Sequence, residues 1–135
     1  FLKQNSLPEN ADFALGIVTG NNKKYISSVK NKDNEVILKG SDIFKYHTNP
    51  NSNYIVFNPQ NFQQVAPIEM YRAPEKLLYR FISSQLVFAY DDKQTLSLNS
   101  CNVVIPKLEG LHIKYILAIL NSRIAQFIYK MEFHS

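Results

Sequence analysis

The most informative segment runs from residue 73 to residue 106 and reads APEKLLYRFISSQLVFAYDDKQTLSLNSCNVVIP. It contains three apolar segments, Lys76–Ile82, Leu86–Tyr90 and Asn102–Ile105, which polar turn residues separate. Short runs rich in Leu, Val, Ile, Phe and Tyr, bounded by Ser, Asp and Asn, are typical of β-strands. The sequence therefore predicts consecutive strands, with a serine turn joining the first two as a hairpin.

The segment Lys76–Ile82 also fits a helix. As a strand it would direct Lys76 and Arg80 to one face and three apolar residues to the other, namely Leu77, Tyr79 and Phe81, although Leu78 and Ile82 interrupt the polar face. As a helix it would begin at Pro74-Glu75 and gather its apolar residues at helical spacing. The pattern alone leaves both open. The short apolar segment that follows and the serine turn favour the strand.

Length and composition predict a single globular domain. A chain of 135 residues can bury roughly two-thirds of its unfolded surface, and a hydrophobic content of 45% excludes the disordered class. The chain starts at Phe1 and stops just after an apolar helical pattern, so we expect a domain taken from a longer protein. The net charge of +4 permits a polyanionic partner without requiring one.

Cysteine usage and hydropathy bear on the compartment. The single cysteine, Cys101, excludes an internal disulfide and fits a reducing environment. No apolar run reaches the length of about 18 residues that is needed to span a bilayer, and no segment resembles a signal peptide. We expect a soluble cytoplasmic protein with no membrane partner.

Short elements are expected before the central stretch. The strand candidates are Ala14–Val18, Tyr25–Val29, Glu35–Lys39 and Tyr54–Phe57. Ser41 could cap a short helix over Asp42–Tyr46. The segment from residue 58 to residue 73 contains two prolines and is expected to be an irregular connection.

The strongest helical pattern lies near the C-terminus. Apolar side chains recur at helical spacing from Ile113 to Met131. Asn121-Ser122 could end one helix and cap the next, so a bent helix and a helix pair both fit. Together these elements predict an α+β fold, a small mixed and mainly antiparallel β-sheet with a C-terminal helix or helix pair packed on it.

The best candidate for a functional loop is Thr19-Gly20-Asn21-Asn22-Lys23-Lys24. Gly and Asn tolerate positive φ, which favours a tight turn. Backbone amides, Asn side chains and two ammonium groups can hold phosphates and reach base edges. An ordinary polar hairpin explains the same residues. The loop lacks the Lys-Ser/Thr ending of a nucleotide-binding P-loop.

Cations recur every four residues at Arg72, Lys76 and Arg80. Lys76 and Arg80 would share a face under either the strand or the helix interpretation, whereas Arg72 lies beyond Pro74. A solvated edge and a DNA-contacting patch both fit this spacing.

Two further patterns resemble catalytic motifs but are incomplete. Asn49-Pro50 and Asn58-Pro59 echo the Asn-Pro-Pro-aromatic motif of amino-methylating enzymes without its second proline. Pro74-Glu75 followed by Asp91-x-Lys93 has the order in which restriction-type nucleases place acids and a lysine to bind Mg²⁺. Such a pattern also arises by chance, and Asp91-Asp92-Lys93 is what a solvated hairpin turn looks like. The three histidines and Cys101 show no metal-ligand spacing.

Four stretches in this order carry a family resemblance: Gly16–Asn22, Leu38–Tyr46, Pro74–Asp92 and Tyr115–Ser122. Their most specific parts are Thr-Gly-x-Asn, Lys-Gly-x-Asp-Ile-x-x-Tyr and Leu-Asn-Ser. The chain resembles the TaqI-like C-terminal specificity domain, which is the target recognition domain of N6-adenine DNA methyltransferases and fused restriction-modification enzymes. The resemblance also favours a strand at Lys76–Ile82.

The resemblance implies that residues 1–135 form one target recognition domain without catalysis or a cofactor of its own. In this family a separate amino-terminal domain binds S-adenosylmethionine and methylates adenine N6, and the specificity domain grips double-stranded DNA. The expected partners are therefore double-stranded DNA and the catalytic methyltransferase domain of the parent chain.

The first hypothesis is sequence-specific binding of duplex DNA. Phosphate contacts are expected from Lys23, Lys24, Arg72, Lys76, Arg80 and Lys93, and base contacts from Thr19, Asn21 and Asn22. The second is a docking module of a restriction complex, with the helix Ile113–Met131 as the seam. The third is a Mg²⁺-dependent nuclease that uses Asp91. No catalytic or metal-binding residue is expected under the first hypothesis.

Overall fold

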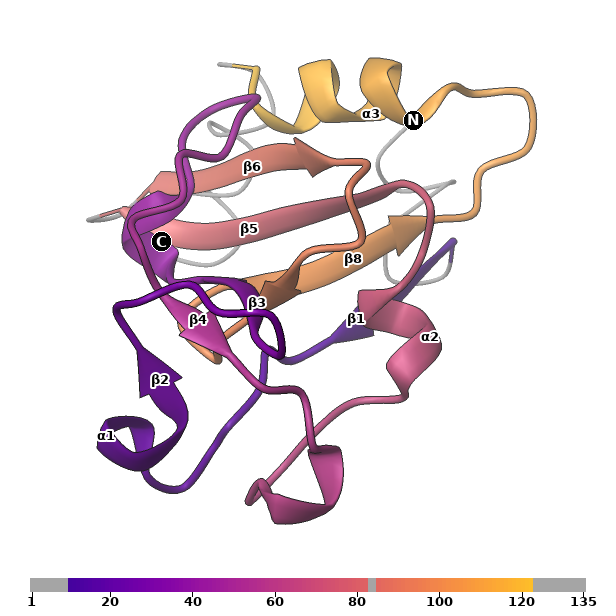
Figure 1. Ribbon diagram of the computed structural model, residues 1–135. Helices are drawn as coiled ribbons and strands as arrows, with labels where there is room; N and C mark the ends of the chain where they lie inside the picture. The colour runs from indigo at the N-terminus through magenta and orange to yellow at the C-terminus, as the bar shows by residue number, and fades with distance from the viewer. Residues whose placement is uncertain (1–9, 83–84, 123–135) are drawn as a thin grey trace.

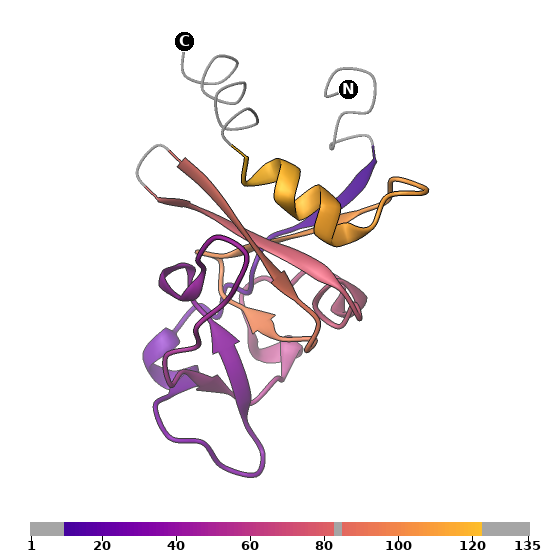
Figure 2. The same cartoon turned by 90° about the horizontal axis from the view of Figure 1, so that it is seen from above.

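The computed structural model describes residues 10–82 and 85–122 (Figure 1). Its elements form three layers, a helix, a long sheet and a small sheet. Figure 2 shows helix α3 on one side of the long sheet and the strands of the small sheet on the other. The predicted α+β class, mainly antiparallel, is confirmed.

The long sheet has the strand order β1-β8-β5-β6, and every pairing in it is antiparallel. Its strands are β1 (Ala11–Ala14), β8 (Asn102–Pro106), β5 (Lys76–Ile82) and β6 (Gln85–Asp91). The hairpin β5–β6 pairs Lys76 with Asp91 at its open end. The strand interpretation of Lys76–Ile82 is confirmed and the helical alternative is wrong, because β5 pairs along both of its edges.

Strand β5 contributes to two separate cores. Leu77 packs with Val104, Ile116 and other residues between the long sheet and α3. Leu78 belongs to the larger core, which also contains Ile37 and other residues of the small sheet. The predicted alternation of side chains is correct, but the face that carries Lys76 and Arg80 is not a solvated edge. The small sheet covers it, which explains why Leu78 interrupts the polar pattern.

The small sheet has the order β2-β4-β3-β7. Its strands are β2 (Ile26–Ser27), β4 (Tyr54–Ile55), β3 (Glu35–Leu38) and β7 (Leu96–Ser97). Strand β7 was not predicted. It follows the turn after β6 and pairs with β3 in parallel. This pairing brings a late segment of the chain next to an early one.

The strand predicted at Ala14–Val18 is wrong in its bounds, since β1 ends at Ala14. Ile17 and Val18 form only isolated bridges. A Cβ on Gly16 would lie 1.9 Å from the carbonyl oxygen of Leu98, so the chain crosses another segment in close contact there. The predicted strand Tyr25–Val29 is shortened to β2 because a helical turn, α1 (Asn22–Tyr25), precedes it.

The helix predicted over Asp42–Tyr46 is also wrong. A 3₁₀ turn, η2 (Gly40–Asp42), ends there, and Ile43 is extended. The Asp42 carboxylate accepts a hydrogen bond from the Lys39 backbone N–H at 2.9 Å, so the acid, rather than Ser41, stabilises the turn. The connection between β4 and β5 contains two short elements, η3 (Pro59–Asn61) and α2 (Ile68–Tyr71).

Helix α3 (Ile113–Leu120) covers the long sheet with its apolar side (Figure 1). The ring nitrogen Nδ1 of His112 accepts a hydrogen bond from the Lys114 N–H and caps its start. The described helix ends at Asn121, a position at which the sequence allowed a helix to end. The second half of the predicted apolar stripe, residues 123–131, lies outside the described residues.

Candidate nucleic-acid interface

The loop predicted to contact DNA is a closely hydrogen-bonded turn that leads into α1. Gly20 has a φ of 85°, a conformation that favours glycine. The Asn21 side chain caps α1 by accepting a hydrogen bond from the Lys24 N–H at 3.2 Å. The Thr19 hydroxyl accepts from the Asn21 N–H at 3.1 Å and donates to the Asn22 side-chain oxygen. These contacts hold the turn in one conformation.

The three residues predicted to contact bases differ in their exposure to solvent. Thr19 is only 3% exposed and holds the turn from inside, which leaves it poorly placed for a base contact. Asn21 and Asn22 are exposed, and no described residue hydrogen-bonds to either side-chain NH₂ group. These two groups remain available as hydrogen-bond donors to acceptor atoms on base edges.

Lys23 and Lys24 are both exposed on α1. The Lys24 ammonium lies 5.2 Å from the centre of the Tyr25 ring. Among the residues that the structure describes, neither lysine forms an ion pair. Two ammonium groups that point into solvent beside the capped turn form a small basic surface.

The Arg72 guanidinium forms hydrogen bonds within the protein. It donates to both carboxylate oxygens of Glu35, at 2.7 and 2.9 Å, and to the Gln94 carbonyl at 2.8 Å. It also lies 5.3 Å from the centre of the Phe57 ring. The hydrogen bond to Glu35 raises the pKa of Arg72. The side chain therefore links α2 to β3 and to the turn after β6.

Lys76 does not fit the predicted phosphate contact, because its side chain is fully buried. Its ammonium donates to the Asp91 carboxylate at 2.6 Å, to the Tyr71 carbonyl at 2.8 Å and to the Thr95 carbonyl at 3.0 Å. All three donors of the ammonium are used. The face of β5 that carries Lys76 lies against the small sheet. The Lys76 ammonium therefore stabilises the fold by linking the end of α2, the end of β6 and the turn after β6.

The Asp91 carboxylate is satisfied on both oxygens. One accepts from Lys76 and from the Thr95 N–H, and the other accepts from the Thr95 hydroxyl at 2.8 Å. Burial acts to raise the pKa of Asp91, but the hydrogen bond and charge of Lys76, together with Thr95, hold this pKa below its ordinary value. Asp91 is 5% exposed.

The nuclease arrangement is not assembled. Asp91 is occupied by Lys76, and Glu75 accepts a hydrogen bond from the Tyr90 hydroxyl, which raises the pKa of Tyr90 to about 12. Within residues 10–82 and 85–122, no group of three or more His, Cys, Asp or Glu residues could hold a metal ion. The Cys101 thiol is buried, and burial raises its pKa to about 12, which does not suit a nucleophile.

The last two predicted cations differ in exposure. Arg80 is half-buried, and its Nε donates to the Ile43 carbonyl at 3.1 Å. Lys93 is exposed in the turn after β6, and no described residue pairs with its ammonium. The structure thus leaves Lys23, Lys24 and Lys93 as cations directed to solvent, on two separate segments of the chain.

A protein-family model described as the TaqI-like C-terminal specificity domain matches residues 35–135. The chain belongs to this family. The resemblance read from the sequence is therefore confirmed, and it supports a DNA-recognition role in restriction-modification systems. A search of the curated proteins finds no match to the chain. None of the described helices has the length and apolar character needed to cross a bilayer.

Residues of the motifs that indicated the TaqI-like specificity domain stabilise its backbone through close contacts and hydrogen bonds. A Cβ on Gly40 would lie 2.5 Å from the Ser100 carbonyl oxygen, and Asp42 secures the turn that follows. The Asn121 side chain accepts from the Phe88 N–H at 2.9 Å and donates to the Phe88 carbonyl at 2.8 Å. Gly16–Asn22, the first stretch of the resemblance, lies outside the matched range.

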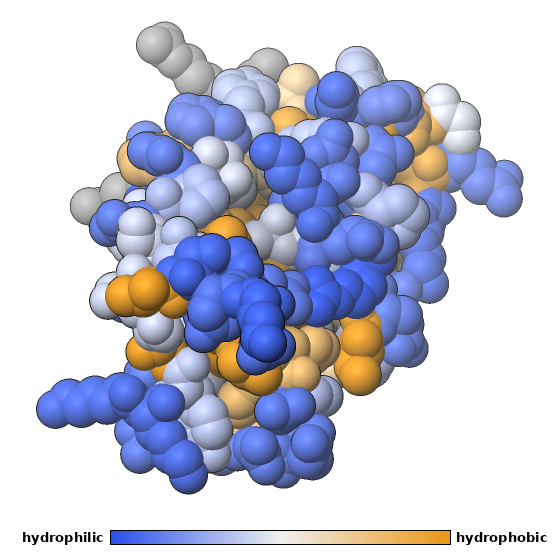
Figure 3. Space-filling view, viewed as in Figure 1, coloured by the Kyte–Doolittle hydropathy of each residue, from blue (hydrophilic) through white to orange (hydrophobic). Residues whose placement is uncertain are grey.

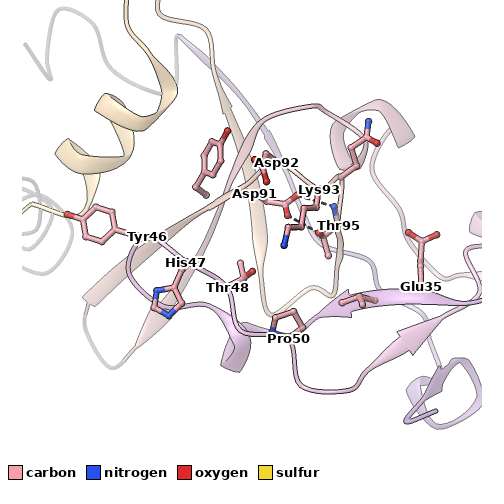
Figure 4. Close-up of a pocket in the computed structure, with 12 residues that line it drawn as sticks. Glu35, Tyr46, His47, Thr48, Pro50, Asp91, Asp92, Lys93 and Thr95 are labelled. Atoms are coloured by element: carbon pink, nitrogen blue, oxygen red, sulfur yellow. Dashed lines mark hydrogen bonds between the residues drawn. The ribbon is translucent and has the colours of Figure 1, made fainter. Parts of the chain in front are cut away.

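The specificity domain also contains an open groove that sequence reasoning missed (Figure 4). It has a volume of about 570 Å³. The lining comes from two segments, the loop after η2 and the end of β6 with its turn, and includes Tyr46, His47, Thr48, Pro50, Tyr90, Asp91, Asp92, Lys93, Gln94 and Thr95, together with Glu35 and Val36. In Figure 4 the Tyr46 ring points away from Asp91, Asp92 and Lys93. The predicted phosphate contact Lys93 therefore shares a groove with exposed aromatic residues. In the sequence, the groove could have been suspected only from the aromatic residues of Leu38–Tyr46.

Proposed function

We propose that this chain is the target recognition domain of an adenine-N6 DNA methyltransferase or restriction-modification enzyme. It binds double-stranded DNA sequence-specifically and performs no catalytic step itself. Methyl transfer from S-adenosylmethionine belongs, in this proposal, to a separate catalytic domain that partners it. Membership of the specificity-domain family supports the recognition role.

The observation that carries the proposal is the capped turn beside α1. It presents the NH₂ groups of Asn21 and Asn22 together with the ammonium groups of Lys23 and Lys24. Phosphate contacts set position on the duplex, and side-chain amides can read base edges, so one rigid turn supplies both kinds of contact. Lys93 adds a third exposed cation at the groove.

The salt dependence of DNA binding tests this assignment. Each lost phosphate contact should reduce the slope of log K against log salt concentration by about 0.9. We expect Lys23→Ala/Lys24→Ala to weaken binding to a mixed-sequence duplex and to flatten the slope by about 1.8 if both contacts are lost. Fluorescence anisotropy of labelled duplex at several salt concentrations measures both quantities.

A control removes a lysine charge elsewhere. Lys107 is exposed and pairs with Asp12 of β1. We expect Lys107→Ala to retain the slope of the wild type. Equal slopes for the wild type and Lys23→Ala/Lys24→Ala would refute the assignment of the turn.

Sequence specificity is tested separately by selection from a pool of random duplexes. We expect the wild type to enrich one sequence and the asparagine variant Asn21→Ala/Asn22→Ala to lose enrichment at some positions of it. Enrichment of no sequence, with a normal salt slope, would reduce the function to non-specific binding.

The docking hypothesis has less support. The described part of the predicted seam uses Ile116 and Leu117 to cover the long sheet, and both are buried. The face seen in Figure 3 is mainly hydrophilic, with hydrophobic residues in small separate groups. Neither observation provides a broad apolar surface for a partner subunit.

A further inference from the structure

The loop after η2 ends in an exposed aromatic tip, which we define as Phe44, Lys45, Tyr46 and His47. Resting on the proposed DNA-recognition function, we infer that this tip contacts the nucleobases of bound DNA, with the Tyr46 ring stacking on a base. The inference adds a specific contact residue on a surface separate from the turn at Asn21–Lys24.

The backbone of Tyr46 has an unusual conformation. Its φ is 75°, a left-handed conformation in which a bulky side chain is an outlier. Two hydrogen bonds to the edge of β6 hold it there, because its N–H donates to the Phe88 carbonyl at 2.8 Å and its carbonyl accepts from the Tyr90 N–H at 3.2 Å. Strained backbone held in this way is a feature of functional sites.

The Tyr46 ring is exposed to solvent. The residue is 49% exposed, and no hydrogen bond or ring contact joins its side chain to another residue in the described ranges. The strained backbone therefore directs a large aromatic side chain toward solvent, where it contributes little to the stability of the fold. Gly40 and Asp42, earlier in the same segment, serve the fold instead.

The surroundings favour nucleic acid over other ligands. Phe44 and His47 stack on each other with their ring centres 5.4 Å apart and an angle of 14° between the planes. Exposed Lys45 lies between them in sequence, and Lys93 lines the same groove as Tyr46. Flat exposed rings beside cations are the combination that binds bases and phosphates together.

The inference is tested with Tyr46→Gly, which removes the ring and also relieves the strain because glycine adopts positive φ freely. We expect thermal stability to stay equal to that of the wild type or to rise. We expect DNA affinity to fall on the order of tenfold, which is the effect of losing one base–aromatic stack. Tyr46→Phe, which keeps the ring, should bind as the wild type does.

The probes are a mixed-sequence duplex and the same duplex with one unpaired thymine. An unpaired base is unstacked at less cost, so the wild type should prefer the second duplex and Tyr46→Gly should lose that preference. Tyr115, which is 56% exposed on α3, supplies the matched control Tyr115→Ala, which should behave as the wild type does.

Three outcomes would overturn the inference. Tyr46→Gly could keep the affinity and preference of the wild type while Lys23→Ala/Lys24→Ala weakens binding, in which case only the inference fails. Tyr46→Gly could lose affinity together with stability, which would make the role structural. Failure of the wild type to bind either duplex would refute the proposed function as well.

Discussion

At the scale of single residues, identical residue types have opposite roles in this domain. Lys76 is fully buried and satisfied by three acceptors, whereas Lys23 and Lys93 are exposed. The difference follows from position, since a lysine on the face of β5 that the small sheet covers must be paired or neutral. Lys76 and Asp91 also pair in the register of β5 and β6, so the ion pair closes the open end of the hairpin.

Removing one partner of this pair should be strongly destabilising. We expect Lys76→Met and Asp91→Asn each to lower the free energy of unfolding by about 3–5 kcal/mol, because each leaves a buried charge uncompensated. The double variant Lys76→Met/Asp91→Leu should recover part of the loss, since it removes both buried charges but leaves the Tyr71 and Thr95 polar groups that they bonded without these partners. Urea unfolding followed by circular dichroism measures all three. Purely additive losses in the double variant would contradict the expectation.

The same pair predicts a pH dependence. Lys76 and Thr95 hold the pKa of Asp91 below its ordinary value, even though burial acts to raise it. The stabilisation is therefore complete above the unfolded pKa of about 3.9 and is lost as pH falls through the lower pKa of the folded state. We expect the melting temperature of the wild type to fall more steeply below about pH 4 than that of Lys76→Met/Asp91→Leu. Parallel curves would show that other carboxylates determine acid stability.

At the scale of elements, β6 is an edge strand whose exposed backbone is covered by side chains and by a loop. The Asn121 side chain accepts from the Phe88 N–H and donates to the Phe88 carbonyl. The Tyr46 N–H donates to the same carbonyl, and the Tyr46 carbonyl accepts from the Tyr90 N–H. Edge strands left unpaired are prone to association with other chains. The end of α3 and the aromatic tip are thus both anchored on one strand.

Asn121→Ala should loosen α3 from β6. The Phe88 N–H would remain buried without its acceptor, which costs about 1–3 kcal/mol. We expect that loss in urea unfolding, together with faster hydrogen exchange at the Phe88 amide. Ala118→Gln, at an exposed position of the same helix, should change stability by no more than about 0.5 kcal/mol. Unchanged exchange at Phe88 in Asn121→Ala would remove the anchoring role.

At the scale of the whole molecule, β5 couples two cores. Leu77 and Leu78 are neighbours in sequence, yet the first packs under α3 and the second packs between the sheets. The two layers therefore share a strand, and they should unfold together.

We expect Leu77→Ala and Leu78→Ala each to lower stability by about 2–5 kcal/mol, the usual range for such cavities. Each should still unfold in one transition, with far-ultraviolet circular dichroism and tyrosine absorbance giving the same midpoint. Val29→Ala, at a 68% exposed position, serves as the control and should change stability by at most about 0.5 kcal/mol. Separate midpoints for the two probes in either variant would show that the layers are independent.

Elements with long, local sequence patterns could be predicted from the residues alone. The hairpin at the centre, the apolar stripe of α3 and the family membership followed from alternation, helical spacing and short motifs. Helical spacing continued to Met131, and it was the capping character of Asn121-Ser122 that allowed a helix to end where α3 does. These features depend on neighbours along the chain, which a sequence displays directly.

Which cations face solvent could not be predicted from local patterns, because it depends on how the sheets pack. Lys76 and Arg80 have the spacing of a surface patch, but the small sheet packs on that face of β5, and its two-residue strands leave almost no pattern in the sequence. The groove between Tyr46 and Lys93 likewise joins segments that are distant along the chain. Burial and proximity arise from long-range packing, and local periodicity carries no record of which surfaces will meet.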